Sequence, residues 1–279
     1  MDDVVYDRAG RGEPLVLIHG IGHRRQAWAP VFPLLTPHRD VIAVDLPGFG
    51  ESPEPAGGYG VEPALVMFKD LFTELGLDRP HVAGNSLGGL LSLELGRAGL
   101  VRSVTALSPA GLWNRRQKLY AIATLKAHRA LAQRTPPNVV RRLAATAAGR
   151  KALVGMIVGR PELLSPEIVA EDAHALATAP GFEPTAAQSR GSGIRGFAPG
   201  RGLRHPDPRK RGFRFTGPVT GVPVTIAWAQ HDRILARPRV AELRKVAPNG
   251  TFALLPGCGH VPMSDDPELV AQTLLAGSR

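Results

Sequence analysis

Short runs of apolar residues, many of them β-branched, recur in the first and last parts of the chain. Each run is continuous rather than alternating, and each ends near glycine, proline or a charged residue. This pattern is typical of strands that are buried on both faces of a sheet. The runs predict six strands, which lie within residues 14–20, 40–48, 81–84, 103–109, 222–232 and 251–260.

Segments with apolar residues at helical spacing lie between these runs. They predict helices at residues 62–75, 87–97 and 237–246, and a last helix capped by Asp266 with Pro267 at its first position. Strands that alternate with helices in this way predict an α/β fold, with a doubly wound and mainly parallel sheet. Ligands of such sheets bind at the carboxyl ends of the strands.

The pattern changes between residues 112 and 216, where helical spacing continues without a convincing strand. Helices are predicted at residues 116–133, 138–147, 151–158 and 166–177, the last behind Ser165 as N-cap. A long strandless stretch between two strands predicts a helical lid inserted over one edge of the sheet. The predicted domains are an α/β core of residues 1–111 and 217–279 and a lid of residues 112–216, which ends in a basic, flexible loop at about 189–216.

Positive charge is concentrated in that last loop. Residues 189–216 hold eight basic residues and one acid, so +7 of the net charge of +10 is local. The same residues include six glycines and three prolines and show no hydrophobic period, which favours a solvated loop over a folded element. Charge alone can bind nucleic acid or anionic lipid without specificity. The distribution favours a surface loop, and no nucleic-acid partner is expected.

The cysteine content and the amino-terminal sequence limit the class of protein further. The single cysteine, Cys258, excludes an intramolecular disulfide and a cysteine-based metal cluster, and we expect it to be an inert, packed thiol. The start MDDVVYDRAG has neither the basic nor the apolar region of a signal peptide, and no apolar run is long enough to span a membrane. We expect a cytoplasmic monomer or homodimer that acts on a small molecule without inserting into a membrane.

Ser86 stands where the run at 81–84 gives way to a helical pattern, in the sequence Gly84-Asn85-Ser86-Leu87-Gly88. This matches G-x-S-x-G, in which a sharp strand-to-helix turn, called the nucleophile elbow, holds a nucleophilic serine. The glycines have a steric purpose, because Cβ atoms there would collide with each other or with the neighbouring strand. The pattern can arise by chance, so its placement between a strand and a helix is what makes Ser86 a candidate nucleophile.

A serine needs a general base, and the base needs an acid to orient it. Asp232 ends one predicted strand, and His260 ends the loop after the next, so both belong at the carboxyl end of the sheet with Ser86. Taken singly, His260 fits a surface position and Asp232 a turn. The chain order Ser, Asp, His is the one expected for this architecture, and it predicts a catalytic triad.

The negative oxygen that forms during acyl transfer needs backbone N–H donors. The first should be Leu87, at the amino end of the helix that follows Ser86, where the helix dipole also helps. The second should come from the loop HGIG after the first long strand, and Ile21 is the candidate. His19 opens that loop, and we expect it to hold the loop's shape through hydrogen bonds to the backbone.

Five sequence motifs together resemble those of the α/β-hydrolase family, and the resemblance covers nearly the whole chain outside the lid. They are HGIG, DLPGFGES, GNSLGG, AWAQHD and GCGHVP. The resemblance implies that Ser86 is the nucleophile, His260 the base and Asp232 its partner, with no cofactor. Related dehalogenases and epoxide hydrolases have aspartate at the elbow, so a serine favours acyl transfer to water.

A carboxylesterase-like reaction is therefore the leading interpretation. Ser86 would attack the carbonyl of an ester or thioester of a small hydrophobic substrate, and water would hydrolyse the resulting acyl-enzyme. Substrate selection would fall to the lid. Trp28, Phe49 and Trp113 are candidate pocket walls, although each could equally serve in packing.

Three other functions fit the same residues. GNSLGG followed by LSPAGL is similar to the carbon-carbon hydrolases of ring-opened aromatic (meta-cleavage) metabolites, which have a lid arginine for the substrate carboxylate and an aromatic residue after the histidine. Here Asp172 occupies the expected neighbourhood of that arginine and Val261 follows His260. The chain also begins close to the family's second strand, which leaves open whether the first is present. A cofactor-free perhydrolase and a small-molecule receptor that keeps the triad are the other two alternatives.

Overall fold

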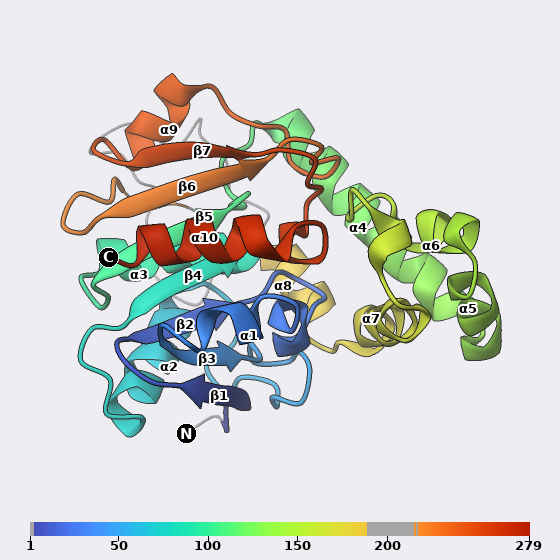
Figure 1. The fold of residues 1–279 in the computed structure, drawn as a ribbon, viewed down its shortest axis with the longest axis horizontal. Helices are drawn as coiled ribbons and strands as arrows, with labels where there is room; N and C mark the ends of the chain where they lie inside the picture. Colours follow the sequence, from blue (N-terminus) through green and yellow to red (C-terminus); the bar gives the residue numbers. More distant parts are fainter. Residues whose placement is uncertain (1–2, 189–214, 216) are drawn as a thin grey trace.

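The computed structural model describes residues 3–188, 215 and 217–279. Within these residues the strands form a seven-stranded sheet in the order β1-β3-β2-β4-β5-β6-β7 (Figure 1). β1 pairs antiparallel with β3, and the other neighbouring pairs are parallel. The strands are β1 Tyr6–Gly10, β2 Pro14–Ile18, β3 Asp40–Val44, β4 His81–Asn85, β5 Ser103–Leu107, β6 Val224–Ala229 and β7 Thr251–Leu255.

β2 to β7 each lie at one of the six apolar runs, so the predicted parallel sheet is confirmed. β1 was not predicted. It forms the edge of the sheet, and four of its five residues are exposed. A search for continuous buried runs cannot detect such a strand, because only one of its sides meets another strand and its side chains are largely polar. Backbone pairing aligns Tyr6 with Val44 and Gly10 with Asp40.

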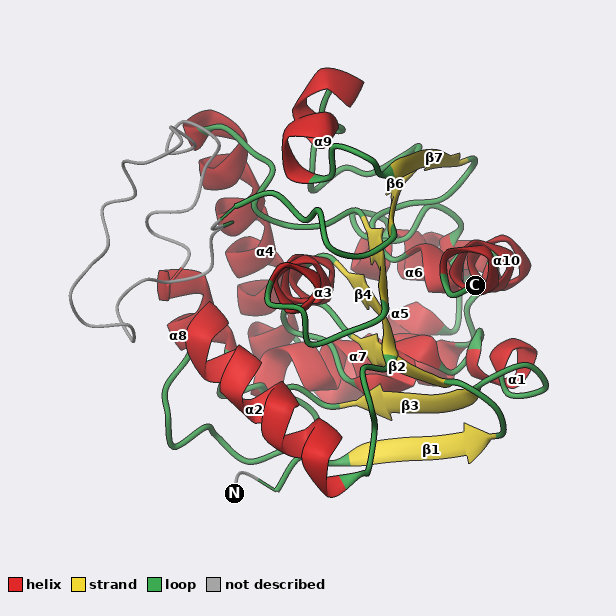
Figure 2. Ribbon diagram, turned by 90° about the vertical axis from the view of Figure 1, so that its left-hand side faces the viewer, coloured by secondary structure: helices red, strands yellow, loops and turns green. Residues whose placement is uncertain are grey.

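Helices cover both faces of the sheet, as Figure 2 shows. α2 (Val61–Glu74), α3 (Leu87–Arg97) and α9 (Val240–Val246) contribute to one apolar cluster. α1 (Phe32–Leu35) and α10 (Pro267–Gly277) contribute to a second cluster on the opposite face. Because the sheet separates the two clusters, its central strands are buried on both sides, as a doubly wound fold requires.

Between β5 and β6, the described chain contains helices and no strand. The helices are α4 Arg115–Arg134, α5 Pro137–Ala144, α6 Ala147–Val154, α7 Pro166–Thr178 and α8 Phe182–Gln188. We call residues 112–188 the helical insertion. In Figure 1, α4 to α7 lie beyond the carboxyl ends of the parallel strands, and a third apolar cluster forms around Val140, Leu153 and Val169. Short 3-10 turns occur at Arg25–Trp28, Pro161–Leu163 and Pro262–Ser264.

The predicted helices are present, with boundaries shifted by local chemistry. Thr146 caps α6 by accepting from the N–H of Gly149, which ends α5 early and starts α6 four residues before the predicted position. Pro238 restricts the residue before it, and α9 begins only at Val240. The predicted caps Ser165 and Asp266 are confirmed by hydrogen bonds to backbone N–H groups. α8 was not predicted.

Two predictions concern the end of the insertion. The predicted basic loop at about 189–216 lies outside the described residues except for Phe215, which is buried. The division of the chain into a core and a lid domain therefore stays a prediction. Within the described residues, no helix has both the length and the apolar character needed to cross a membrane.

Candidate active site

Ser86 occupies the sharp turn between β4 and α3. Its backbone has φ 56° and ψ −112°, in a region that is costly for a residue with a side chain. Hydrogen bonds impose this conformation. The N–H of Ser86 donates to the carbonyl of Leu107 (2.9 Å), and its carbonyl accepts from Leu90 (3.1 Å) and Ala110 (2.9 Å).

The two glycines of the motif are required by close packing of backbone on backbone. A Cβ on Gly84 would overlap the carbonyl group of Gly88, and a Cβ on Gly88 would overlap the carbonyl of Ile18 in β2. The predicted steric purpose of both glycines is thus confirmed. They let α3 begin directly against two strands, and this places Ser86 at the end of the sheet.

His260 and Asp232 form a hydrogen-bonded pair. Nδ1 of His260 donates to Oδ2 of Asp232 at 2.8 Å, and both side chains are buried. The other oxygen of Asp232 accepts from the N–H groups of Ile234 (2.9 Å) and Leu235 (2.7 Å). Burial alone would raise the pKa of Asp232, but the charge and hydrogen bond of His260 and the two N–H donors outweigh it, so the pKa is lowered. Asp232 is therefore a charged carboxylate, held in place by backbone N–H groups, that accepts a hydrogen bond from the His260 imidazole.

Ser86 and His260 meet at one small cavity. Each is only 5% exposed, and both line a cavity of about 50 Å³ whose wall also includes Gly20 and Ile21. Asp232 stands behind His260, on the loop after β6. The structure thus brings the three predicted residues, from three separate strand ends, to the same rim of the sheet.

Ser86 also lines a second cavity, of about 30 Å³. Ile21, Leu87 and Trp113 line it. Leu87 is the first residue of α3, so its N–H has no acceptor within the helix and carries part of the positive end of the helix dipole. Both predicted oxyanion donors, Ile21 and Leu87, and one predicted pocket wall, Trp113, therefore line a cavity with Ser86.

The other two candidate pocket walls lie elsewhere. Trp28 is fully buried in the apolar cluster that α1 and α10 share, which is a packing position. Phe49 lines a different cavity, of about 610 Å³, next to α2, and its ring meets His19 edge-on at 5.7 Å between centroids. Neither residue is on the wall of the two cavities beside Ser86.

The loop that carries His260 is anchored from two directions. The side chain of Asn85 donates to the carbonyl of His260 at 2.9 Å, which ties the loop to the elbow. Asp265 accepts from the N–H of Gly259 in the same loop (2.7 Å) and from those of Gly159 (3.0 Å) and Arg160 (2.6 Å) in the helical insertion. The sequence analysis missed both roles, because neither side chain follows a helix or strand period that would mark it.

Cys258 precedes His260 by two residues and is not a plausible nucleophile. Its side chain is buried and makes no disulfide. Burial, reinforced by the charges of Asp265 and Asp266, raises the pKa of Cys258 to about 12. The thiol therefore stays protonated near neutral pH, as expected for a packed cysteine.

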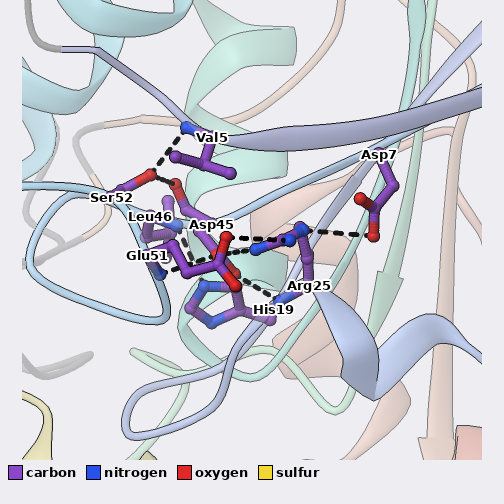
Figure 3. Close-up of polar contacts among 8 residues, drawn as sticks. All are labelled: Val5, Asp7, His19, Arg25, Asp45, Leu46, Glu51 and Ser52. Carbon is purple, nitrogen blue, oxygen red and sulfur yellow. Dashed lines mark hydrogen bonds and ion pairs between the residues drawn. The ribbon is translucent and has the colours of Figure 1, made fainter.

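A buried carboxylate anchors the loop that holds Ile21 (Figure 3). Asp45, which follows β3, is fully buried and accepts from the backbone N–H of Arg25 and from its guanidinium, both at 2.5 Å. The backbone N–H of Glu51 donates to the same carboxylate at 2.9 Å. Since a buried charge must be paired, Asp45 fixes the loops after β2 and β3 against each other.

His19 makes the second link between these two loops. Its Nε2 accepts from the backbone N–H of Leu46 at 2.9 Å, so Nδ1 carries the proton and donates to the carbonyl of Gly20 at 2.7 Å. Burial lowers the pKa of His19 to about 4, which keeps the imidazole neutral. The expectation that His19 shapes the loop through backbone hydrogen bonds is confirmed.

A parallel sheet with a serine at a sharp strand-to-helix turn defines an α/β-hydrolase fold. A sequence model of the alpha/beta hydrolase family matches residues 15–273, and the chain belongs to that family. Over 88 residues (30% of this chain and 32% of the relative) it is 47% identical to 2-hydroxy-6-oxo-2,4-heptadienoate hydrolase of Pseudomonas putida. Over 89 residues (32% and 34%) it is 42% identical to pimeloyl-acyl-carrier protein methyl ester esterase of Legionella pneumophila.

A similar fold occurs in a thermophilic esterase from Thermogutta terrifontis, with a TM-score of 0.69 and 18% identity over 98% of this chain and 92% of that one. The relatives therefore include both esterases and hydrolases of carbon-carbon bonds. Within the described residues, no group of three or more histidine, cysteine, aspartate or glutamate side chains is arranged to hold a metal ion.

Gly88→Ala should lower the free energy of unfolding by about 2 kcal/mol or more, because the new Cβ meets rigid backbone of β2. Gly221→Ala is the control, since a Cβ there enters open space, and it should change stability by less than about 0.5 kcal/mol. Urea denaturation measures both. Equal stabilities of the two variants would contradict the packing described for the elbow.

Asp45→Asn should lower the free energy of unfolding by about 3–5 kcal/mol, because it leaves the mostly buried guanidinium of Arg25 without its buried partner. Asp7→Asn removes an exposed partner of the same guanidinium, 3.1 Å away, and should cost less than about 1 kcal/mol. Chemical denaturation compares them at neutral pH. A loss of similar size in both variants would show that burial of Asp45 is not what anchors the loops.

His19 should make the fold sensitive to acid. Its pKa is about 4 when folded against an ordinary 6.5, so its contribution to stability is complete above pH 6.5 and is lost as pH falls towards 4. The difference amounts to about 3 kcal/mol. His19→Gln keeps a donor and an acceptor without titrating, and its unfolding free energy should fall less between pH 7 and pH 4. If the unfolding free energies of the wild type and His19→Gln fell equally between pH 7 and pH 4, the assigned role of His19 would be wrong.

Proposed function

We propose that this member of the alpha/beta hydrolase family is a serine hydrolase that cleaves an ester or thioester of a small hydrophobic substrate. The observation that carries the proposal is Ser86 itself. It is held in a strained turn, and its cavity also contains the imidazole of a buried His260–Asp232 pair. Strain of this kind persists only where the surrounding structure enforces it, and it is concentrated at functional sites.

The steps of the reaction follow from which atoms of Ser86 and His260 are available to react. Nδ1 of His260 is engaged by Asp232, so Nε2 is the atom that removes the proton as Ser86 Oγ attacks the carbonyl carbon. The N–H groups of Leu87 and Ile21 stabilise the negative oxygen of the tetrahedral intermediate. As the intermediate collapses, Nε2 returns the proton to the leaving alcohol or thiol, and Ser86 remains acylated.

Water then completes the cycle. Nε2 of His260 takes a proton from a water molecule as its oxygen attacks the acyl carbon, and the second intermediate releases the acid and restores the Ser86 hydroxyl. Asp232 orients the imidazole and stabilises its protonated form in both halves. The lowered pKa of Asp232 suits this role, because it keeps the carboxylate charged.

Size and composition of the cavities support a small substrate. The two spaces beside Ser86 measure about 50 and 30 Å³, and the second is lined mainly by apolar side chains. Helices α4 and α7 contribute Leu125 and Leu176 to the first cavity. We therefore assign the helical insertion the role of a lid that closes over the substrate.

Hydrolysis of a carbon-carbon bond is the second candidate, because the Pseudomonas putida relative is named for such a substrate and is 47% identical over the matched part. Asp172 argues against it. This carboxylate lines the cavity that contains Ser86 and His260, where it would repel the carboxylate of a substrate such as the heptadienoate named for that relative. Ester or thioester hydrolysis therefore remains the first proposal.

A fluorophosphonate probe should label Ser86 and no other residue, as peptide mapping by mass spectrometry would show. Ser86→Ala should abolish both labelling and turnover, while its unfolding free energy stays within about 1 kcal/mol of the wild type or rises. Labelling elsewhere, or full activity of Ser86→Ala, would remove the catalytic assignment.

Steady-state assays separate the candidate reactions. Continuous release of nitrophenol from short-chain nitrophenyl esters is the result expected for an esterase. Turnover of a ring-opened aromatic diketone, with little ester hydrolysis, would favour the carbon-carbon hydrolase. A single slow turnover with retained ligand would favour a receptor, and peracid formation from a carboxylic acid and hydrogen peroxide would favour a perhydrolase.

A further inference from the structure

The cavity beside Ser86 has a polar wall that the proposed triad does not use. His23 follows the loop after β2, His128 lies on α4, and Asp172 lies on α7. All three line the same cavity of about 50 Å³ as Ser86 and His260. α4 and α7 pack against each other in the helical insertion (Figure 1). The cavity is therefore lined jointly by His23 from the loop after β2 and by side chains of the insertion.

His23 has unused capacity for hydrogen bonds. Its Nδ1 is buried, and no described residue pairs with it. Its Nε2 lies 3.9 Å from Oδ2 of Asp172, which is beyond hydrogen-bond distance. A buried polar atom that is left unpaired destabilises the protein, so a ligand that supplies the missing hydrogen-bond partner binds more tightly for it.

His128, which is half-buried, lines the same cavity from α4. Within the described part of the chain, no hydrogen bond or ion pair involves its imidazole. Burial lowers its pKa, so the ring is neutral near pH 7 and presents one N–H donor and one nitrogen acceptor. A group that both donates and accepts a hydrogen bond is the natural complement of such a ring.

The charge around the cavity and its size limit which chemical group can bind there. Asp172 is close to a cation, since Arg24 lies 3.6 Å from its Oδ1, but the guanidinium also pairs with Glu171 at 2.8 Å. An anionic ligand would face the Asp172 carboxylate, so an uncharged group fits better. One water needs about 10–15 Å³ of such space, and a cavity of about 50 Å³ therefore admits only a few non-hydrogen atoms.

The position of His260 decides which part of the substrate lies there. Nε2 of His260 must return a proton to the leaving oxygen, so the leaving group departs on the side that His260 lines. The cavity of about 50 Å³ includes His260 together with His23 and His128, whereas the cavity next to Trp113 includes none of these three. The alcohol part of an ester therefore belongs against His23 and His128, and the acyl part belongs beside Trp113.

We propose that His23, His128 and Asp172 form a specificity-determining site for a free hydroxyl group on the alcohol part of the substrate. The preferred substrates are then esters of small diols or polyols, rather than esters of simple alkyl alcohols. This inference rests on the proposed ester hydrolysis at Ser86. A site built to pair with a hydroxyl group discriminates strongly against an analogue that lacks it, because its own polar atoms are then left unpaired.

The test compares two esters that differ by one group, 2-hydroxyethyl butyrate and propyl butyrate, by the acid each releases. The wild type should prefer the hydroxyethyl ester by about tenfold or more in kcat/KM. His23→Leu and His128→Leu should each bring that ratio close to one, and His128→Gln, which keeps a donor and an acceptor, should restore much of it. His174→Leu is the control, since His174 is exposed on α7 and lines a different cavity, and it should leave the ratio unchanged.

An unchanged ratio in His23→Leu and His128→Leu, or a wild-type preference for the propyl ester, would overturn the inference. A second measurement does not depend on turnover. In Ser86→Ala protein, the imidazole ¹⁵N signals of His23 and His128, assigned by their loss in the variants, should shift with 2-hydroxyethyl butyrate and much less with propyl butyrate. Equal shifts or none would overturn the hydroxyl site, whereas a wild type that cleaves neither ester, with the selective shifts present, would overturn only the hydrolytic function.

Discussion

The contact of backbone with backbone at the elbow is the constraint on which the rest of the structure depends. Ser86 takes a positive φ at a turn where α3 starts against β2 and β4 without side chains between them, at Gly84 and Gly88. This requires β4 to be a central parallel strand with β2 beside it, which the sheet order provides. The same turn places Leu87, the first residue of α3, beside Ser86 at the positive end of the helix dipole.

The loops around Ser86 are held by carboxylates that take no part in the proposed chemistry. Asp45 joins the loops after β2 and β3, and Asp265 joins the loop of His260 to the helical insertion. Each carboxylate is buried, so its oxygens must find donors, and the backbone N–H groups of the loops supply them. Groups that react must be held within a fraction of an ångström, and buried polar anchors provide that rigidity on loops.

The sequence was sufficient for β2 to β7, because buried parallel strands appear as continuous apolar runs, and for the positions of Ser86, Asp232 and His260, because motif and chain order locate strand ends. It was insufficient for β1, whose residues are largely exposed, and for the pocket. Trp28 has the size and apolar character of a residue that lines a pocket. Whether such a residue faces a pocket or the core depends on tertiary packing, which the sequence pattern does not contain. Asp265 lies next to the helix cap Asp266 in the sequence. Its role could not be predicted, because its hydrogen bonds go to Gly159 and Arg160, about a hundred residues earlier in the chain.

The central claim is that the end of β4 is a catalytic centre with its stabilising groups already in place. A crystal structure of the protein with a small alkyl boronic acid tests it most directly, because such acids form tetrahedral adducts with activated serines. The account predicts boron bonded to Ser86 Oγ, one boronate oxygen within hydrogen-bond distance of the N–H groups of Ile21 and Leu87, and the other facing Nε2 of His260. A boronate bound at another residue, or one whose oxygens meet neither the two N–H groups nor His260, would contradict it.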